Sequence, residues 1–124
     1  MKRIEFGELV IGEVARKNLM HVCDTNWASG GPKVKQLEKE WSDIFGYKRS
    51  VAMSSGTDAV INACLALYDI AGAKRGDKVI VPALSFIATS NAVRAAGLTP
   101  TFVDVKKETL NINEEQIEEA ITDR

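Results

Sequence analysis

The turn Ser54–Thr57 holds the residues best suited to chemistry, because it joins an expected strand to an expected helix. A helix N-terminus leaves several backbone N–H groups unpaired and carries partial positive charge. Gly56 permits a close backbone approach, and the hydroxyls of Ser55 and Thr57 add further donors. Together these groups suit a phosphate dianion. A simpler interpretation stays open at this point, namely a serine that caps a helix after a strand.

Phe86 is the second candidate, in the short loop that follows the expected strand at 78–82. In parallel α/β sheets, ligands collect beyond the carboxyl ends of the strands. A phenylalanine at that end could stack on a flat ring. The alternative is a phenylalanine that simply packs in the core.

Two other side chains are candidates for ligand contact. Asp104 lies in the expected strand at 101–105 and is either a ligand-binding group or a turn former, the commoner role of an aspartate leaving a strand. Trp27 lies in a loop rich in glycine and is either a binding or oligomer contact or an anchor for that loop. The acidic run at 114–119 predicts a solvated helix face.

The chain has two cysteines and one histidine, which limits redox and metal chemistry. Cys23 and Cys64 both fall in apolar helical patterns, so we expect buried thiols in a reducing compartment. Neither cysteine has a basic cluster nearby that would make it a nucleophile. His21 alone cannot supply a histidine-rich site, and no metal is expected.

Charge and hydropathy exclude several classes of protein. Sixteen Lys and Arg against seventeen Asp and Glu give a formal net charge of −1, which argues against a nucleic-acid or anionic-membrane partner. No apolar run approaches the ~18 residues of a membrane span. Acidic residues interrupt the N-terminus where a signal peptide needs an apolar core. We therefore expect a cytoplasmic protein.

Alternating helices and strands must position these candidates. The apolar periodicity predicts five helices near 11–23, 32–45, 59–71, 86–96 and 114–121, and three strands near 49–54, 78–82 and 101–105. Strands separated by helices imply a parallel sheet with right-handed crossovers. The helix at 59–71 is apolar nearly all round, and such a helix is normally buried on several sides.

Read together, these segments resemble the opening of a known family, the DegT/DnrJ/EryC1/StrS group of pyridoxal-phosphate-dependent sugar aminotransferases. The matching stretches cover nearly the whole chain after the first ten residues: WASGGPKVKQLEKEW (27–41), VAMSSGTDAV (51–60), GDKVIVPALSFIATSNAVRAAGLTPTFVDV (76–105) and TLNINEEQIEEAIT (109–122). The resemblance implies an α/β fold with a three-layer parallel sheet, the N-terminal part of the large domain of the aspartate-aminotransferase fold (fold type I). It also implies an N-terminal helix and loop at 1–31 and a partial cofactor-binding domain at 32–124.

The resemblance assigns roles to both candidate loops. Ser55, Gly56 and Thr57 would hold the 5′-phosphate of pyridoxal phosphate, and Phe86 would stack on its pyridine ring. Family members are several times longer than 124 residues. The resemblance thus implies that the catalytic lysine, the acid that pairs the pyridine nitrogen and the small C-terminal domain lie outside this chain. We expect no catalytic residue within it and no activity from it alone.

The activity implied for the full-length enzyme is amination of a keto-sugar nucleotide with glutamate as amino donor. Its products would serve cell-surface polysaccharide, such as lipopolysaccharide, or secondary-metabolite sugars. The alternatives are a sugar dehydratase of the same family, with histidine in place of the lysine, and a non-catalytic phosphate-binding α/β module. We also expect a homo-oligomer that buries the 59–71 helix or an open strand edge, or else a rearranged fold with the first strand beside the second.

Overall fold

The computed structural model describes residue 7 and residues 9–121 of the chain. The chain divides into two compact units, Met1–Ala52 and Met53–Arg124. Within the described residues, no helix combines the length and the apolar character that a bilayer crossing requires.

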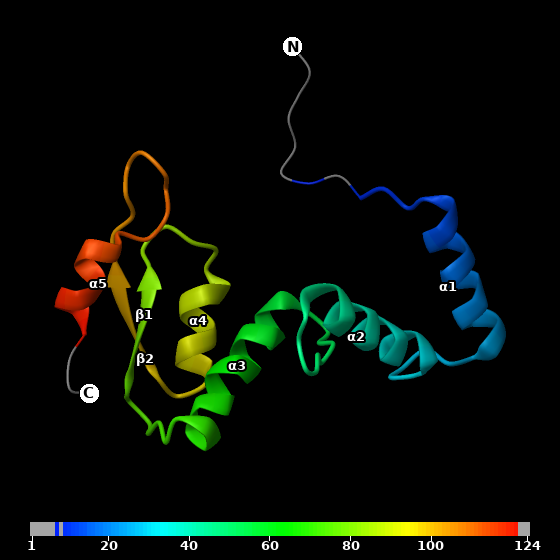
Figure 1. Cartoon of the computed structure of the whole chain (residues 1–124), viewed down its shortest axis with the longest axis horizontal. Coiled ribbons are helices and arrows are strands. Elements are labelled where there is room, and N and C mark those ends of the chain that lie inside the picture. Colours follow the sequence, from blue (N-terminus) through cyan, green and yellow to red (C-terminus); the bar gives the residue numbers. More distant parts are fainter. Residues whose placement is uncertain (1–6, 8, 122–124) are drawn as a thin grey trace, which may run out of the picture. The chain divides into compact units, whose positions relative to one another are not determined.

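The first unit contains two helices, α1 (Glu13–Thr25) and α2 (Pro32–Phe45) (Figure 1). The bounds of α2 agree with the sequence, because proline suits the first helical position and glycine suits a left-handed residue after the last. Gly46 has that left-handed conformation, with φ 70°. Asn26 ends α1 in the same way, with φ 53°.

The apolar stripe of α1 is uncovered in this unit. None of its described residues is buried, and the thiol of Cys23 is exposed. The expectation of a buried Cys23 is therefore wrong. A helical stripe indicates where a helix can pack, but α2 does not pack extensively against α1.

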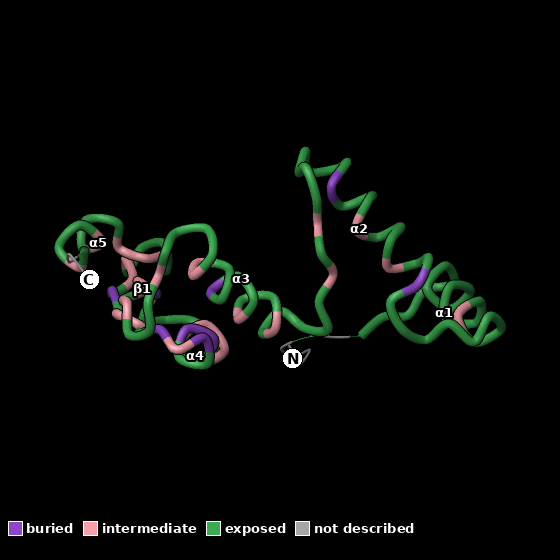
Figure 2. Tube along the Cα trace, turned by 90° about the horizontal axis from the view of Figure 1, so that it is seen from below, coloured by how far each residue is buried: buried purple, intermediate pink, exposed green. Residues whose placement is uncertain are grey.

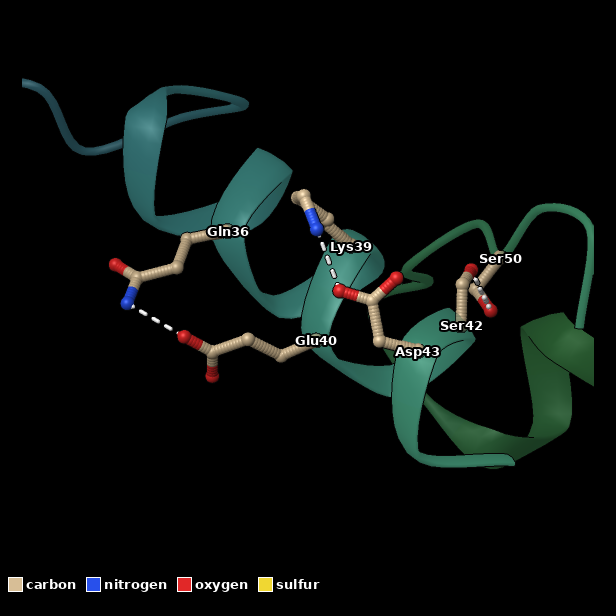
Figure 3. A network of polar contacts seen from close by, with 6 residues as sticks. All are labelled: Gln36, Lys39, Glu40, Ser42, Asp43 and Ser50. Carbon is tan, nitrogen blue, oxygen red and sulfur yellow. Dashed lines mark hydrogen bonds and ion pairs between the residues drawn. The ribbon is translucent and has the colours of Figure 1, made fainter. Parts of the chain in front are cut away.

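The expected strand at 49–54 is absent, and this is the main correction to the predicted fold. A strand needs a neighbouring strand for its backbone groups, and this segment interacts with α2 instead. The hydroxyl of Ser42, the buried polar residue of α2, donates to Ser50 Oγ at 2.8 Å (Figure 3). The backbone N–H of Ala52 donates to Glu38 Oε1 at 2.9 Å.

The second unit has α/β order. Its elements are α3 (Gly56–Ile70), β1 (Lys78–Pro82), α4 (Ala88–Ala95), β2 (Thr99–Val103) and α5 (Glu114–Ala120). The strands pair in parallel, from Lys78 opposite Thr99 to Pro82 opposite Val103. The sheet lies between α4 and α5 (Figures 1 and 2). The parallel three-layer arrangement is thus confirmed, with two strands in the described chain rather than three.

The last predicted strand is displaced by two residues. Pairing with β1 fixes β2 at 99–103, so Asp104 and Val105 fall beyond its end. Asp104 accepts the N–H of Val105 on Oδ1 at 2.8 Å, which is the behaviour of a turn former. Val105 then forms an isolated antiparallel bridge with Ile112.

The core of the second unit gathers around α4 and the sheet (Figure 2). Its buried members are Cys64, Val81, Val93, Ala96 and Leu98. Cys64 is the buried residue of α3, as expected for that thiol, but Ile70 on the same helix is 79% exposed. The helix α3, which was expected to be buried on several sides, therefore has much of its apolar surface exposed to solvent.

Candidate functional site

The start of α3 is built by its capping residue. Ser55 has extended backbone angles, φ −154° and ψ 163°, and its Oγ accepts the N–H of Asp58 at 3.1 Å. The N–H of Ala59 reaches the carbonyl of Ser55 at 3.1 Å, so the regular helical bonding begins there. The alternative interpretation of a serine cap is thus confirmed, although no strand precedes it. The cap places Gly56 and Thr57 in the first turn, where N–H groups have no helical partner.

Three backbone donors lie at this point. The N–H groups of Ser55, Gly56 and Thr57 have no helical carbonyl four residues earlier to accept them, and all three residues are exposed. A Cβ placed on Gly56 would meet no atom within 4 Å, so an incoming group has room beside the backbone. The positive end of a 15-residue helix dipole adds to the attraction for an anion.

Asp58 is the charged residue of this turn, and it is not among the residues predicted to form the site. Its carboxylate accepts the hydroxyl protons of Ser54 and of Ser55, the latter at 2.9 Å. These two hydrogen bonds, the Ser54 bond first, hold the pKa of Asp58 below its ordinary value. The signal was present in the sequence, since an acid three residues after a serine is the spacing of a capping box.

Phe86 lies in the loop that connects β1 to α4, as the sequence predicted, and α4 begins two residues later. Its side chain is 73% exposed, so it is not the core phenylalanine of the alternative interpretation. On the same loop, the hydroxyls of Ser85 and Thr89 share a hydrogen bond of 2.7 Å.

The fold brings the two candidate loops to one end of the second unit. The arrow of β1 points toward the end at which both α3 and α4 begin (Figure 1). That end is where parallel α/β sheets bind ligands. The helix start offers donors to a phosphate, and the exposed ring of Phe86 offers a face to a flat heterocycle. The residues present therefore fit pyridoxal phosphate.

The other candidates do not join this group. Trp27 and His21 are both exposed and belong to the first unit. A Cβ on Gly31 would fall 2.4 Å from Cδ1 of Trp27, so the indole packs on its own loop.

The acidic run at the start of α5 binds a lysine instead of a ligand. Lys106 Nζ lies 3.1 Å from Oε1 of Glu114 and 3.6 Å from Oε1 of Glu115. In the described part of the chain, no three His, Cys, Asp or Glu residues gather as a metal site would require.

The chain is similar in sequence and structure to known proteins. A sequence model of the DegT/DnrJ/EryC1/StrS aminotransferase family matches residues 10–124. The spore coat polysaccharide biosynthesis protein SpsC of Bacillus subtilis (strain 168) is 37% identical over 115 residues, which cover 93% of this chain and 28% of that protein. The 3-oxo-glucose-6-phosphate:glutamate aminotransferase of the same organism is 44% identical over 104 residues, which cover 84% of this chain and 23% of that protein.

A solved structure resembles the chain along almost its full length. The E. coli GDP-4-keto-6-deoxy-D-mannose-3-dehydratase with bound hydrated pyridoxal phosphate gives a TM-score of 0.87 at 34% identity. The match covers 99% of this chain and 32% of that enzyme. The chain thus spans between about a quarter and a third of the length of the relatives it matches.

Proposed function

The chain belongs to the DegT/DnrJ/EryC1/StrS aminotransferase family, and from this membership we propose that it supplies the phosphate- and ring-binding part of a pyridoxal-phosphate-dependent sugar aminotransferase. The observation that carries the proposal is the pairing of an open helix start at 55–57 with an exposed Phe86 at the same end of the second unit. The family match over residues 10–124 supports reading these two features as one site.

The phosphate is held at the first turn of α3 in this proposal. The N–H groups of Ser55, Gly56 and Thr57 and the hydroxyl of Thr57 donate to its oxygens, and the helix dipole stabilises its charge. Gly56 leaves the approach free of a side chain. When bound, pyridoxal phosphate supplies an electron sink for chemistry at the carbon that bears the amino group.

Phe86 orients the cofactor ring. An aromatic face against a flat heterocycle fixes the plane of the ring while the phosphate fixes one end. The residues of this chain therefore bind and orient, and we assign none of them a proton-transfer step. In this proposal, the catalytic lysine and the acid that pairs the pyridine nitrogen lie outside the 124 residues, as the family resemblance implies.

The substrates proposed for the whole enzyme are a keto-sugar nucleotide and glutamate. The glutamate aminotransferase of B. subtilis, at 44% identity, supports the amino donor. A second candidate function is dehydration of a keto-deoxysugar nucleotide, supported by the likeness to the E. coli 3-dehydratase at TM-score 0.87. Both activities would use the same phosphate site.

The setting of the enzyme is also part of the proposal. We place it in the cytoplasm, in the synthesis of sugars for lipopolysaccharide or related surface polysaccharide, and we expect a homo-oligomer. Residues 1–31 would form an N-terminal helix and loop, and residues 32–124 part of the cofactor-binding domain. The large exposed side chains of α2 and α3, such as Trp41 and Ile70, support an assembly that covers them.

Calorimetric titration with pyridoxamine 5′-phosphate tests the binding site, because this form of the cofactor lacks the aldehyde that reacts with any lysine. Pyridoxamine without phosphate is the matched ligand, and we expect it to bind at least about tenfold more weakly. Thr57→Val and Phe86→Ala should each weaken the phosphate form by about tenfold. Phe45→Ala removes an exposed ring of the first unit and should leave the affinity unchanged. Equal affinity for the two ligands contradicts the proposal.

A further inference from the structure

The start of α3 has fewer donors for an anion than its sequence suggests. A serine hydroxyl carries one proton to donate and two lone pairs that accept. The single proton of Ser55 goes to Asp58 Oδ2 at 2.9 Å, and the proton of Ser54 goes to the same oxygen. A lone pair of Ser55 Oγ is used as well, because it accepts the N–H of Asp58.

The phosphate monoester dianion of the cofactor has only acceptors, so it cannot bind to the remaining lone pairs of these two hydroxyls. The donors left for it are the N–H groups of Ser55, Gly56 and Thr57 and the hydroxyl of Thr57. Within the described residues, that hydroxyl has no hydrogen-bond partner. The turn thus separates into a serine pair bound to Asp58 and a set of free donors beside it.

Resting on the proposed cofactor site, we propose that Asp58 is a positioning residue that withholds the hydroxyl protons of Ser54 and Ser55 from the phosphate. Within this turn, the phosphate is then held by the backbone of 55–57 and by the hydroxyl of Thr57. The carboxylate also places a negative charge in the turn that receives the dianion. Inorganic phosphate binds weakly for both reasons, and tight binding needs the additional ring contact with Phe86.

The carboxylate keeps its charge at neutral pH. Hydrogen bonds from Ser54 and Ser55 stabilise the ionised form and lower the pKa of Asp58 from its ordinary value of 3.8. Asp58 is thus a permanent internal anion at the helix start, in the position where a capping box places an acid.

Two substitutions at position 58 separate the effect of charge from the effect of the withheld protons. Asp58→Asn removes the charge but keeps an oxygen that accepts a hydroxyl. Asp58→Ala removes both and frees the two serine protons. Inorganic phosphate is titrated into the full chain, and the amide shifts of 55–57 give the dissociation constant. We expect phosphate to bind about threefold more tightly to Asp58→Asn and about tenfold or more to Asp58→Ala.

The control is Asp69→Asn, which makes the same charge change near the other end of α3 and should alter the affinity less than about twofold. Adding Ser55→Gly to Asp58→Ala should remove part of the gain, because the freed proton is lost, while glycine still begins the helix well. Circular dichroism checks that α3 stays formed in each variant.

The outcomes distinguish this inference from the function on which it rests. If phosphate shifts 55–57 in the unmodified chain but binds Asp58→Ala equally or more weakly, the role of Asp58 is wrong and the phosphate site stands. If pyridoxamine 5′-phosphate shifts none of 55–57 in the unmodified chain, the cofactor site fails and the inference fails with it.

Discussion

The two units of the chain use their apolar residues in opposite ways. In the second unit, Val81, Val93 and Leu98 are each less than 5% exposed, because α4 packs on the paired strands. In the first unit, α1 and α2 have well-defined ends, yet Leu37 is 53% exposed and Ile44 is 74% exposed. Both units are regular in local structure, but the second alone has a hydrophobic cluster among the described residues.

The difference shows that the residues that define the ends of a helix do not by themselves bury that helix. A proline can begin a helix, and a glycine or an asparagine can end one, without a packed neighbour. Burial needs a second surface, and in the second unit the parallel strand pair and α4 supply it. The candidate site lies in the unit that has this support, where its two loops are held at one end of a packed sheet.

The largest expected effect is a loss of stability in the core of the second unit. Leu98→Ala should lower the free energy of unfolding by about 3 kcal/mol, because it removes a buried side chain and leaves a cavity in the core. Leu37→Ala makes the same change on the exposed face of α2 and should cost less than about 1 kcal/mol. Urea unfolding followed by circular dichroism measures both. Equal costs would show that the two units are packed to the same degree.

A smaller effect is expected at the cap of α3. Ser55→Ala removes the acceptor for the N–H of Asp58 and should cost about 1 kcal/mol. Ser55→Gly should cost only a few tenths of a kcal/mol, because glycine tolerates the capping position. Urea unfolding of the two variants gives the comparison. If alanine and glycine cost the same, the serine does not stabilise the helix start.

The smallest effect concerns α1, which begins after Gly12 and has no capping side chain there. Gly12→Ser should stabilise its first turn by a few tenths of a kcal/mol, since a Cβ at this position meets no atom within 4 Å. Gly12→Ala should destabilise the turn. Amide hydrogen exchange at 13–16 measures both. Slower exchange in the alanine variant than in the serine variant would contradict a capping effect.

The sequence predicted the features that depend on short stretches of residues. Pro32 and Gly46 marked the ends of α2, a serine cap was expected before α3, and Phe86 was placed in the loop after β1. Each of these rests on the conformational preference or hydrogen bonding of one or two residues, which a linear sequence contains. The predicted helix starts were less accurate, because α3 begins at Gly56 rather than at 59 and α4 begins at Ala88 rather than at 86.

The features that were missed depend on partners distant in the sequence. The segment 49–54 has the composition of a strand, but strand formation needs a neighbour, and its polar groups contact α2 instead. Cys23 lies in a helical stripe that α2 does not cover. Asp58 was overlooked for another reason, because the turn was considered only as a set of donors, and the resident acid that binds two of them was left out.

The proposed function depends most directly on where the cofactor phosphate binds. The measurement is the amide shift of every residue on addition of pyridoxamine 5′-phosphate to the full, isotopically labelled chain. We expect large shifts at 55–57 and at Phe86, and none at Lys33 and Val34, which lie in the first turn of α2, a helix start without the Ser-Gly-Thr turn. Equal shifts at the two helix starts, or shifts at α2 alone, would contradict a phosphate site built by the second unit.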